Sequence, residues 1–389
     1  MILGAGILQL PAIVKAKQMG YEVVAVDMNP QAIGFSSADI KLVISTIDVE
    51  KVVEAAKKYQ VIGVMTLASD LPMRTVAAVA KTLGLSGIAP ETAFAATDKG
   101  EMIKIFQEQG VEHPWFYIVQ SEKELYDIKQ KFDYPCIIKP TDNSGSRGVH
   151  LVNNESELIV AYNYSKQQSR KGRVVIEEYL RGPEVSVEII VCQGEVHVIQ
   201  VTDKLTTGAP HFVEMGHNQP SRLDKNDIIK ISDLATRAVK AIGIDNSAAH
   251  VEIILTKDGP KMVELGARMG GDCITTHLVP LSTGVDMLEA TIKLACGDEP
   301  KLESKFNQGS AIRFLNVPMG TIINVEGIDE AKGIEGVKQI FLTKNVGDIV
   351  GEIGSSTDRV GFVIAQANTA EEAINICEQA IKKIKFTVK

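Results

Sequence analysis

The sequence predicts a protein of mixed α/β and α+β class, with a doubly wound parallel sheet at its N-terminal end and a strand-rich C-terminal domain. Three observations carry this prediction. Strands and helices alternate over residues 1–92, short strands around a single helix follow from Val111, and the tail from Ser310 is rich in strands. Because 389 residues are too many for one ordinary domain, two to four domains are expected.

The N-terminal alternation is regular. Strands are predicted at MILGAG, YEVVAVDMNP and VIGVMTLAS, and helices at LQLPAIVKAKQMG, VEKVVEAAKKYQ and DLPMRTVAAVAKTLG. Such alternation is typical of a parallel sheet with helices on its faces. The next stretch, 89–110, adds helices and places Asp98 and Lys99 near a helix start.

The pattern changes in the middle of the chain. Strands are predicted at PWFYIV, YPCIIKP, GVHLV and RVVIEEYL around one helix, ESELIVAYNYSKQQSR, which indicates a small α+β unit. A two-strand pattern follows, with its turn at Gln193 and Gly194. The segments DIIKISDLATRAVKAIG, GVDMLEATIKLACG and TAEEAINICEQAIKKI are predicted helices, and KLTTGAPHFVEMGHNQP is predicted to be a loop.

Composition and charge exclude several classes of function. The apolar share of 45% and the charged share of 23% are those of a soluble globular protein. A net charge of −8 without a basic block argues against nucleic acid or an acidic membrane surface as the main partner. No apolar run is long enough to cross a membrane, and we expect no signal peptide. Five scattered cysteines without CxxC spacing indicate a reduced, cytoplasmic protein.

The stretch VEIILTKDGPKMVEL is predicted to form a hairpin that carries two glutamates. With a loop at 257–259, Thr256 faces Pro260 and Glu252 faces Glu264, while the other face, which includes Val263, is nearly all apolar. A two-residue Asp-Gly loop would bury the charge of Glu264, so the first register is preferred.

Directly opposed like charges destabilise a strand pair, so the two glutamates need an explanation. A divalent cation explains them best, because it offsets their repulsion and takes hard oxygen ligands. The alternative is a pair of solvated carboxylates. Arg268, which follows on a glycine-rich segment and could reach the charge of a transferring phosphate, favours the metal.

Two glycine-containing turns could approach phosphate. The turn GAGILQ, with Asp27 ending the next strand, partly matches a dinucleotide-binding fingerprint, but Gln9 replaces the third glycine, so a plain strand-to-helix turn is favoured. In CIIKPTDNSGSRGVHLV, backbone N–H groups could approach phosphate oxygens and Lys139 would add a point charge. A mobile hairpin tip is equally compatible with this second segment.

Two further groups of polar residues have no clear meaning alone. Glu177 and Glu178 follow an apolar strand and Glu184 precedes another, as solvated charges at strand ends often do. Glu214 and His217 lie in the predicted loop. They could recognise a small polar substrate, although an ordinary surface loop is slightly favoured without context.

Together, these residues resemble the ATP-grasp superfamily over the whole chain. By that resemblance, Lys99 and Lys139 bind phosphate, Glu252 and Glu264 hold Mg²⁺ or Mn²⁺, and Arg268 acts at the acyl-phosphate site. The remaining ATP-binding residues that the resemblance implies are Ser144, Gly145, Ser146 and Gly148 in the lid loop, Glu177, Glu178, Tyr179 and Leu180 in the adenine hinge, and Glu184 at the ribose.

The resemblance also has a departure and a narrower implication. Many members carry an asparagine two residues after the second glutamate, where this chain has Gly266. The segments FVEMGHNQP and VELGARMGGD resemble the L-amino acid ligases, which make dipeptides, and imply that Glu214 and His217 lie at the amino acid substrate. The implied domains are a pre-ATP-grasp domain at 1–92, an ATP-grasp domain at 93–302 with a mobile lid at about 112–178, and a C-terminal α+β domain at 303–389.

The resemblance implies an ATP-dependent carboxylate–amine ligase that forms an amide through an acyl phosphate and releases ADP and phosphate. Its partners would be small-molecule carboxylate and amine substrates, and a homodimer is compatible with the sequence. One alternative is an ATP-grasp carboxylase that makes carboxyphosphate from bicarbonate. The other is a non-catalytic nucleotide-binding or NAD-dependent protein, and Gln9 argues against NAD.

Overall fold

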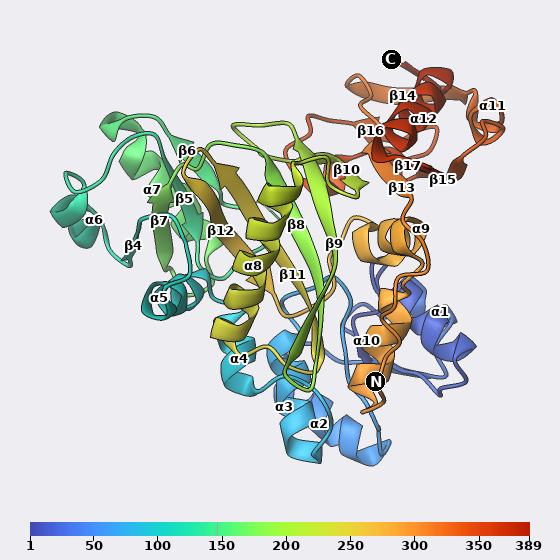
Figure 1. Ribbon diagram of the computed structural model, residues 1–389, viewed down its shortest axis with the longest axis horizontal. Coiled ribbons are helices and arrows are strands. Elements are labelled where there is room, and N and C mark those ends of the chain that lie inside the picture. The colour runs from blue at the N-terminus through green and yellow to red at the C-terminus, as the bar shows by residue number, and fades with distance from the viewer. Residues whose placement is uncertain (146) are drawn as a thin grey trace.

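The computed structural model describes residues 1–145 and 147–389. Figure 1 shows three lobes around a long central sheet: the N-terminal helices below it, a small sheet with its helices to one side, and the C-terminal strands and helices above it on the other side. The candidate site is built where these parts meet along the central sheet.

The N-terminal lobe contains the predicted parallel sheet, in the order β1-β2-β3. Its strands are β1 (Ile2–Leu3), β2 (Val24–Asp27) and β3 (Ile40–Val43), and its helices are α1 (Leu10–Gln18), α2 (Val49–Lys58) and α3 (Met73–Leu83). Two details differ from the prediction. Strand β3 was not expected, and the strand predicted at VIGVMTLAS is reduced to one parallel bridge between Ile2 and Met65, because β1 offers only two residues for pairing.

Two helices lead from this lobe to the site. They are α4 (Pro90–Ala95) and α5 (Lys99–Gln109). Asp98 caps α5, since its carboxylate accepts hydrogen bonds from the backbone N–H groups of Gly100 and Glu101 at 3.1 and 3.2 Å. This cap fixes Lys99 at the first position of the helix, as the sequence suggested.

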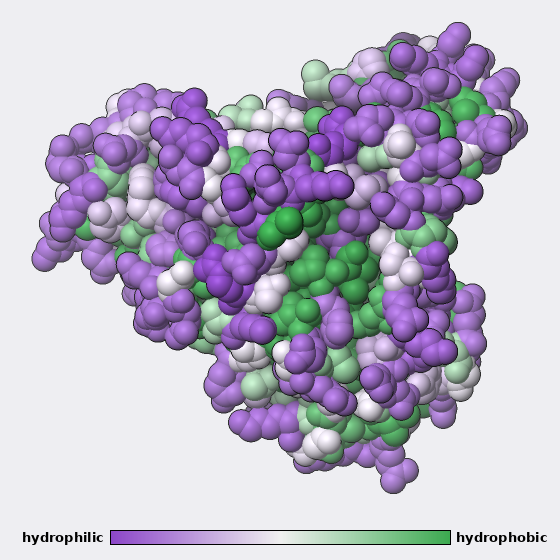
Figure 2. All heavy atoms as spheres, in the orientation of Figure 1, coloured by the Kyte–Doolittle hydropathy of each residue, from purple (hydrophilic) through white to green (hydrophobic). Residues whose placement is uncertain are grey.

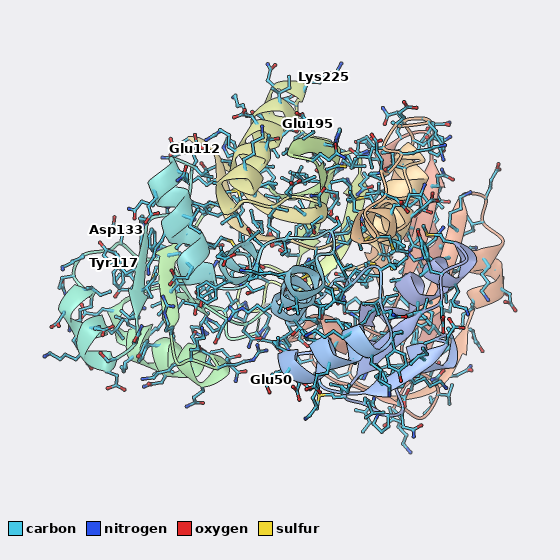
Figure 3. The ribbon with its side chains drawn as sticks, turned by 90° about the horizontal axis from the view of Figure 1, so that it is seen from below. Glu50, Glu112, Tyr117, Asp133, Glu195 and Lys225 are labelled. Atoms are coloured by element: carbon cyan, nitrogen blue, oxygen red, sulfur yellow. The ribbon has the colours of Figure 1, made fainter. Side chains whose placement is uncertain are left out.

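The second lobe is a four-stranded antiparallel sheet, here named the lid sheet, in the order β4-β7-β5-β6. Its strands are β4 (Phe116–Val119), β5 (Cys136–Pro140), β6 (His150–Val152) and β7 (Val174–Glu178). Its helices are α6 (Glu122–Ile128), which was not predicted, and α7 (Leu158–Gln168). Seen from below, Tyr117 and Asp133 of this lobe lie to one side, away from Glu50 of the N-terminal lobe (Figure 3).

The central sheet has eight strands in the order β12-β11-β8-β9-β10-β13-β17-β15. The five strands from the middle of the chain are β8 (Glu184–Cys192), β9 (Glu195–Thr206), β10 (Glu214–Gln219), β11 (Ser247–Thr256) and β12 (Gly259–Gly266). The three from the C-terminal part are β13 (Gly309–Phe314), β15 (Val337–Leu342) and β17 (Gly361–Ala367). The sheet is therefore continuous from the middle of the chain into the C-terminal lobe.

Helices cover both faces of the central sheet. Helix α8 (Lys225–Ile242) packs on the face that carries Val187 and Ile189, and α10 (Met287–Ala295) packs near Ile190 on the other. A π-helical turn (Ile274–Leu278) leads into α9 (Val279–Thr283). Because both faces of β8 are covered, the strand is buried almost throughout, including the polar residues Ser186 and Glu188.

The C-terminal lobe adds a small antiparallel sheet in the order β16-β14-β18. Its strands are β14 (Gly320–Glu326), β16 (Ile349–Val350) and β18 (Lys385–Val388), and its helices are α11 (Ile328–Lys332) and α12 (Ala370–Lys383). A capping box at Thr369 and Glu372 starts α12, which buries Ala373 and Cys377 against the strands.

The outer surface in the view of Figure 2 is mostly hydrophilic, with hydrophobic side chains gathered toward the centre of this face. Across residues 1–145 and 147–389, no helix combines the length and the apolar character that a membrane crossing requires.

Candidate active site

A cavity of about 490 Å³ lies between the lid sheet and the central sheet. Its walls also include residues 68–70 of the N-terminal lobe and residues 355–357 of the C-terminal lobe. Fourteen residues singled out from the sequence line it: Lys99, Lys139, Ser144, Gly145, Glu177, Glu178, Tyr179, Leu180, Glu184, Glu214, His217, Glu252, Glu264 and Arg268. The fold thus brings together residues spread over 170 positions, from Lys99 to Arg268.

The hairpin of β11 and β12 places Glu252 directly opposite Glu264, in the register that the sequence suggested. The predicted loop, however, is wrong, because Thr256 pairs with Gly259 and the turn is only Lys257 and Asp258. A bulge after Glu252 then shifts the register by one residue. Met262, which is 1% exposed, consequently takes the core position predicted for Val263.

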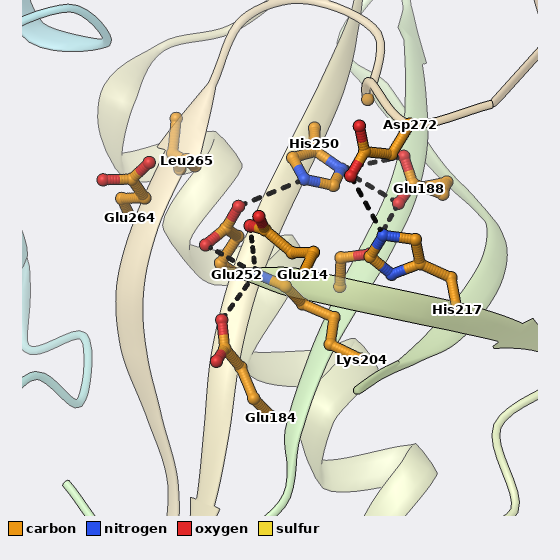
Figure 4. A network of polar contacts seen from close by, with 12 residues as sticks. Glu184, Glu188, Lys204, Glu214, His217, His250, Glu252, Glu264, Leu265 and Asp272 are labelled. Carbon is orange, nitrogen blue, oxygen red and sulfur yellow. Dashed lines mark hydrogen bonds and ion pairs between the residues drawn. The ribbon is translucent and has the colours of Figure 1, made fainter. Parts of the chain in front are cut away.

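Lys204 of β9 joins three of the predicted acids, although the sequence analysis did not single it out (Figure 4). Its Nζ lies 2.5 Å from Glu184 Oε1, 3.0 Å from Glu252 Oε2 and 3.8 Å from Glu214 Oε1. Burial opposes the charge of Lys204, but the three carboxylates outweigh it and hold the lysine pKa well above its usual value. The resemblance assigns Glu184 to the ribose, Glu252 to the metal and Glu214 to the amino acid. In the structure, these three acids share the ammonium group of Lys204.

A buried histidine supports Glu252 from the other side. His250 Nδ1 lies 2.9 Å from Glu188 Oε1, and its Nε2 lies 3.3 Å from Glu252 Oε1 (Figure 4). Burial alone would lower the pKa of His250, but the two carboxylates outweigh it and raise this pKa to about 9. Burial likewise favours a neutral Glu252, yet Lys204 and His250 hold the pKa of Glu252 well below its usual value. Glu252 is therefore an anion near neutral pH.

The two predicted phosphate-binding lysines both form ion pairs. Lys99 Nζ lies 2.8 Å from Glu264 Oε2 and donates a hydrogen bond to the carbonyl oxygen of Asn143 at 2.7 Å. Lys139 on β5 pairs with Glu177 on β7 at 2.7 Å, and both side chains are 6% exposed. Each lysine is thus held at the cavity wall by one carboxylate.

The residues predicted as an adenine hinge lie at the end of β7 and directly after it. Glu177 and Glu178 end the strand, and Tyr179 and Leu180 follow it along the cavity wall. The carboxylate of Glu178 pairs with Lys261 of β12 at 2.7 Å, which ties the lid sheet to the hairpin. The Glu177 carboxylate is paired with Lys139.

Only some residues of the predicted lid loop line the cavity. Ser144 and Gly145 line the cavity, whereas Ser146 lies outside the described residues. Gly148 is not among the lining residues. It has φ of +81°, and a Cβ there would lie 2.8 Å from Gln168 Cβ, so its glycine serves the packing of the loop on α7.

Arg268 is held by a residue of the N-terminal lobe. Its Nε and Nη2 donate to the two oxygens of Asp70 at 2.7 and 3.0 Å, a bidentate pair. A Cβ at Gly266 would lie 3.0 Å from Asp70 Oδ1 and 3.1 Å from Arg268 Cζ. The Asp70–Arg268 pair therefore occupies the space that an asparagine side chain at position 266 would need.

Glu214 and His217 lie on strand β10, so the prediction of a loop for them was wrong. The strand is hard to recognise from sequence because it contains glycine and few apolar residues, and it is held between β9 and β13. The buried His217 lies with its Nε2 3.4 Å from Asp272 Oδ2, while its Nδ1 has no hydrogen-bond partner among residues 1–145 and 147–389.

Arg359 of the C-terminal lobe supports this side of the cavity from behind its lining residues. Its Nη1 and Nη2 donate to the two oxygens of Asp272 at 2.7 and 2.6 Å, and Nη1 also donates to the Glu214 carbonyl oxygen at 3.0 Å. The guanidinium carbon lies 3.6 Å from the centre of the Phe314 ring. Arg359 therefore fixes both predicted substrate residues, one through Asp272 and one through its backbone.

The carboxylate oxygens of Glu252 and Glu264 are the kind of ligand that a hard divalent cation prefers. Glu252 and Glu264 both line the cavity, and each already attracts an ammonium group, from Lys204 and Lys99. No cluster of three or more His, Cys, Asp or Glu side chains with metal-binding geometry occurs in the described part of the chain. The two carboxylates would therefore share a metal with oxygens from outside the protein.

Two family models match the chain. Residues 132–276 match an ATP-grasp domain, and residues 313–389 match the L-amino acid ligase C-terminal domain 2. Alanine–anticapsin ligase of Bacillus amyloliquefaciens is 28% identical over 271 residues. That match covers 64% of this chain and 57% of the ligase, so the chain spans little more than half the length of this relative.

Solved structures share the whole fold. The L-amino acid ligase of Bacillus licheniformis superposes with a TM-score of 0.87 at 22% identity, over 100% of this chain and 98% of that one. Phosphoribosylglycinamide synthetase of Anaerococcus prevotii gives a TM-score of 0.81 at 23% identity, with the same coverage. The chain therefore carries an ATP-grasp domain at residues 132–276, and it resembles the L-amino acid ligases in its C-terminal domain and in its overall fold.

Proposed function

We propose that this ATP-grasp ligase joins a small carboxylic acid, such as an amino acid, to an amine. In this proposal the carboxylate attacks the γ-phosphorus of ATP, giving an acyl phosphate and ADP. The amine then attacks the acyl carbon and expels phosphate. One amide bond forms, and ADP and phosphate leave.

The observation that carries the proposal is the convergence of two kinds of residue in one cavity. Cations and acids suited to a nucleotide and its metal, such as Lys99, Lys139 and Glu264, share the wall with Glu214 and His217, which suit an amino acid. Phosphoryl transfer depends mainly on positioning and on neutralising charge, so both sets must lie within reach of one phosphate.

Four residues have roles in phosphoryl transfer under this proposal. Lys99 and Lys139 bind phosphate oxygens after leaving Glu264 and Glu177, their partners in the structure. Glu252 and Glu264 then hold Mg²⁺ or Mn²⁺. When bound, the metal supplies positive charge that offsets the charge on the phosphate oxygens. Because Glu252 is kept ionised by His250 and Lys204, it needs no proton release to bind that metal.

Arg268 acts at the acyl group. Asp70 holds its guanidinium by two hydrogen bonds, which leaves N–H groups on Nη1 and Nη2 for the acyl phosphate and for the oxyanion formed when the amine attacks. A closed cavity is needed because water would hydrolyse the acyl phosphate, and we assign the lid sheet and its loop to this role.

Glu214 and His217 orient the carboxylate substrate. The Glu214 carboxylate pairs with the substrate ammonium, and His217 donates a hydrogen bond to the carboxylate oxygen that will be phosphorylated. Asp272, which also lines the cavity and is paired with Arg359, holds the imidazole of His217 through Nε2. Its Nδ1 is buried and has no hydrogen-bond partner among residues 1–145 and 147–389.

A screen of phosphate release tests the proposed function. The purified protein is incubated with ATP, Mg²⁺ and all pairs of the twenty amino acids, with a parallel series containing bicarbonate. We expect phosphate release that depends on an amino acid pair and yields an amide product by mass spectrometry. Phosphate release that needs bicarbonate and no amine would make the protein a carboxylase. Release with no substrate dependence would overturn the proposal.

A further inference from the structure

A second cavity, of about 250 Å³, adjoins the candidate active site. The two cavities share six lining residues: Asp70, Lys99, Asn143, Ser144, Glu264 and Arg268. The other walls include Ile47, Val49 and α3 of the N-terminal lobe and residues 170–171 of the lid lobe. One end of this second cavity therefore contains Lys99, Glu264 and Arg268, to which the proposed function gives roles in phosphoryl transfer and at the acyl phosphate.

Three cations of this second cavity lack an acidic partner. Arg74, Arg170 and Lys171 line it, and within residues 1–145 and 147–389 no carboxylate lies within 4.0 Å of their charged nitrogens. The other cations of the wall are already neutralised, Lys99 by Glu264 and Arg268 by Asp70. We name Arg74, Arg170 and Lys171 the basic wall.

The third acid that lines this second cavity, after Asp70 and Glu264, is also occupied. Asp142 accepts hydrogen bonds from the backbone N–H groups of Arg170 and Lys171 at 3.2 and 3.1 Å and from Ser169 Oγ at 2.8 Å. It fixes the loop that carries the two cations. The charge of their side chains therefore remains available to an anion from outside the protein.

Arg74 is held in place without an anion. Its Nε donates to Thr97 Oγ1 at 2.7 Å, and its Nη2 donates weakly to the Thr97 carbonyl oxygen at 3.4 Å. Its guanidinium lies 4.7 Å from the centre of the Phe94 ring, and Lys171 Nζ lies 5.1 Å from the same ring. Two cations from different lobes thus meet on one aromatic ring, with Nη1 of Arg74 free of hydrogen bonds to the described residues.

We propose that the basic wall binds the anionic group, a carboxylate or a phosphate monoester, of the amine substrate. The inference rests on the proposed function. With the anion at Arg74 and Lys171, the amine end points toward Arg268 and Glu264, where the acyl group forms. The cavity then determines which amines are used, because a substrate without the anion would leave these cations unpaired.

The substitution Arg74→Met tests this subsite, with Lys81→Met as the matched control. Met keeps an apolar stem over Phe94, and Lys81 lies two turns further along α3, with a side chain 66% exposed and outside the cavity. Three kinds of amine are compared: amino acids, the corresponding amino acid amides, and O-phosphoethanolamine. Steady-state kinetics give KM for each amine and for ATP.

The subsite predicts a selective loss. In Arg74→Met, the KM of amines that carry the anion should rise by about ten- to a hundred-fold, as for loss of a charge-assisted hydrogen bond. KM for amides and for ATP should stay the same, and Lys81→Met should match wild type. A selective effect on amino acids identifies a carboxylate site, and one on O-phosphoethanolamine identifies a phosphate site. Equal effects on acids and amides, or none, would overturn the proposal.

Two further measurements keep the outcome decisive. If Arg74→Met does not fold, Lys171→Met, which changes an exposed lysine of the lid lobe, is judged by the same criteria. If wild type turns over no amine, the proposed function fails and the subsite is judged by binding alone. Inorganic phosphate is then titrated into the ADP- and Mg²⁺-saturated protein. Binding that weakens at least tenfold in Arg74→Met sustains the basic wall as an anion site, and equal binding overturns it.

Discussion

Lysines and glutamates of the cavity neutralise one another in ion pairs. Lys99 pairs with Glu264, Lys139 with Glu177, and Lys204 with Glu252, all at distances between 2.7 and 3.0 Å. An unpaired buried charge is costly, so these pairs keep the site folded. Under the proposed function, substrates would bind by exchanging partners, with phosphate taking the lysines and metal taking the glutamates.

The first prediction concerns Glu264, one of the two opposed acids. We expect Glu264→Gln to lose Mg²⁺-dependent turnover while the fold survives. The side chain is 24% exposed, and the amide oxygen of a glutamine at this position could still accept a hydrogen bond from Lys99 Nζ, so the ammonium group would keep a partner. Turnover against Mg²⁺ concentration and the melting temperature are measured together.

The matched control is Glu195→Gln, at the exposed start of β9 and far from the cavity lining. If the Glu264→Gln variant turns over as fast as wild type at limiting Mg²⁺, Glu264 is not a ligand of the metal. A large fall in melting temperature would instead give it a structural role.

The second prediction separates an amino acid ligase from other ATP-grasp enzymes. Glu214→Ala should weaken binding of the amino acid by roughly 1.5–3 kcal/mol, or one to two decades, because a charge-assisted bond to the substrate ammonium is lost. ATP binding should change little. Calorimetry with a substrate from the screen, and separately with ATP, measures both. Equal losses would place Glu214 at the nucleotide or in the fold, and no loss would make it an ordinary cavity acid.

At the scale of elements, close backbone contacts position the hinge and the hairpin. Gly182, between the hinge and β8, has φ of +150°, and a Cβ there would lie 1.9 Å from the carbonyl oxygen of Leu255. Gly259, in the turn of the hairpin, has φ of +116°, but a Cβ there would meet nothing within 4 Å. The two glycines thus face the same kind of backbone strain, and only Gly182 also faces a clash.

The third prediction compares these glycines. Gly182→Ala should push the start of β8 away from β11, lowering both the melting temperature and the affinity for ATP, since Glu184 and Tyr179 flank it. Gly259→Ala should cost only about 1–3 kcal/mol of backbone strain and leave ATP affinity unchanged. Thermal unfolding and ATP calorimetry on both variants are the measurements. If both variants show the same melting temperature and the same ATP affinity, the backbone around Gly182 and Leu255 can move apart without cost, and the prediction is wrong.

The sequence predicted elements best where one local signal dominated. The hairpin of β11 and β12 was predicted because glycine, aspartate and proline mark its turn, although the length of that turn was wrong. Helices α8 and α12 were predicted because their periodicity is clear. Strand β10 was missed because two neighbouring strands hold it rather than its own composition. The bulge after Glu252 was missed because packing of Met262 in the core decides it, and no local pattern reports that packing.

The candidate site could be predicted only in part, for a related reason. Motif residues such as Lys139 and Glu264 stand out in short stretches. Lys204, Asp70, Asp272 and Arg359 act through partners far away in the chain, 198 positions in the case of Asp70 and Arg268. A lone lysine or aspartate carries no signal of such a contact, so only the fold reveals these residues.

At the scale of the whole molecule, the lobes are joined by charged pairs at the cavity. Asp70 ties the N-terminal lobe to Arg268, Glu178 ties the lid sheet to Lys261, and Asp272 ties the central sheet to Arg359. The division that we propose near residue 303 falls between α10 and β13, yet β13 continues the central sheet through β10. The C-terminal lobe is thus part of the site.

The fourth prediction concerns the acid stability of that last connection. Burial would raise the pKa of Asp272, but Arg359 and His217 outweigh it and lower the pKa below its usual value. A depressed folded-state pKa contributes stability that is present above the unfolded value of roughly 3.9 and is lost as pH falls below it. Asp272→Asn should therefore be less stable than wild type at pH 7, and the difference should narrow below about pH 4. Urea unfolding from pH 2 to 7 measures it, and a pH-independent difference would contradict the assignment.

The most direct test of the central claim follows the oxygen atoms of the carboxylate substrate. The substrate found in the screen is labelled with ¹⁸O in its carboxylate and turned over with ATP, Mg²⁺ and the amine. Because the acyl phosphate keeps a carboxylate oxygen on phosphorus when the amine displaces phosphate, the account predicts one ¹⁸O in each released phosphate and ADP in equal amount. Label in AMP, or phosphate without label, would contradict an acyl phosphate route.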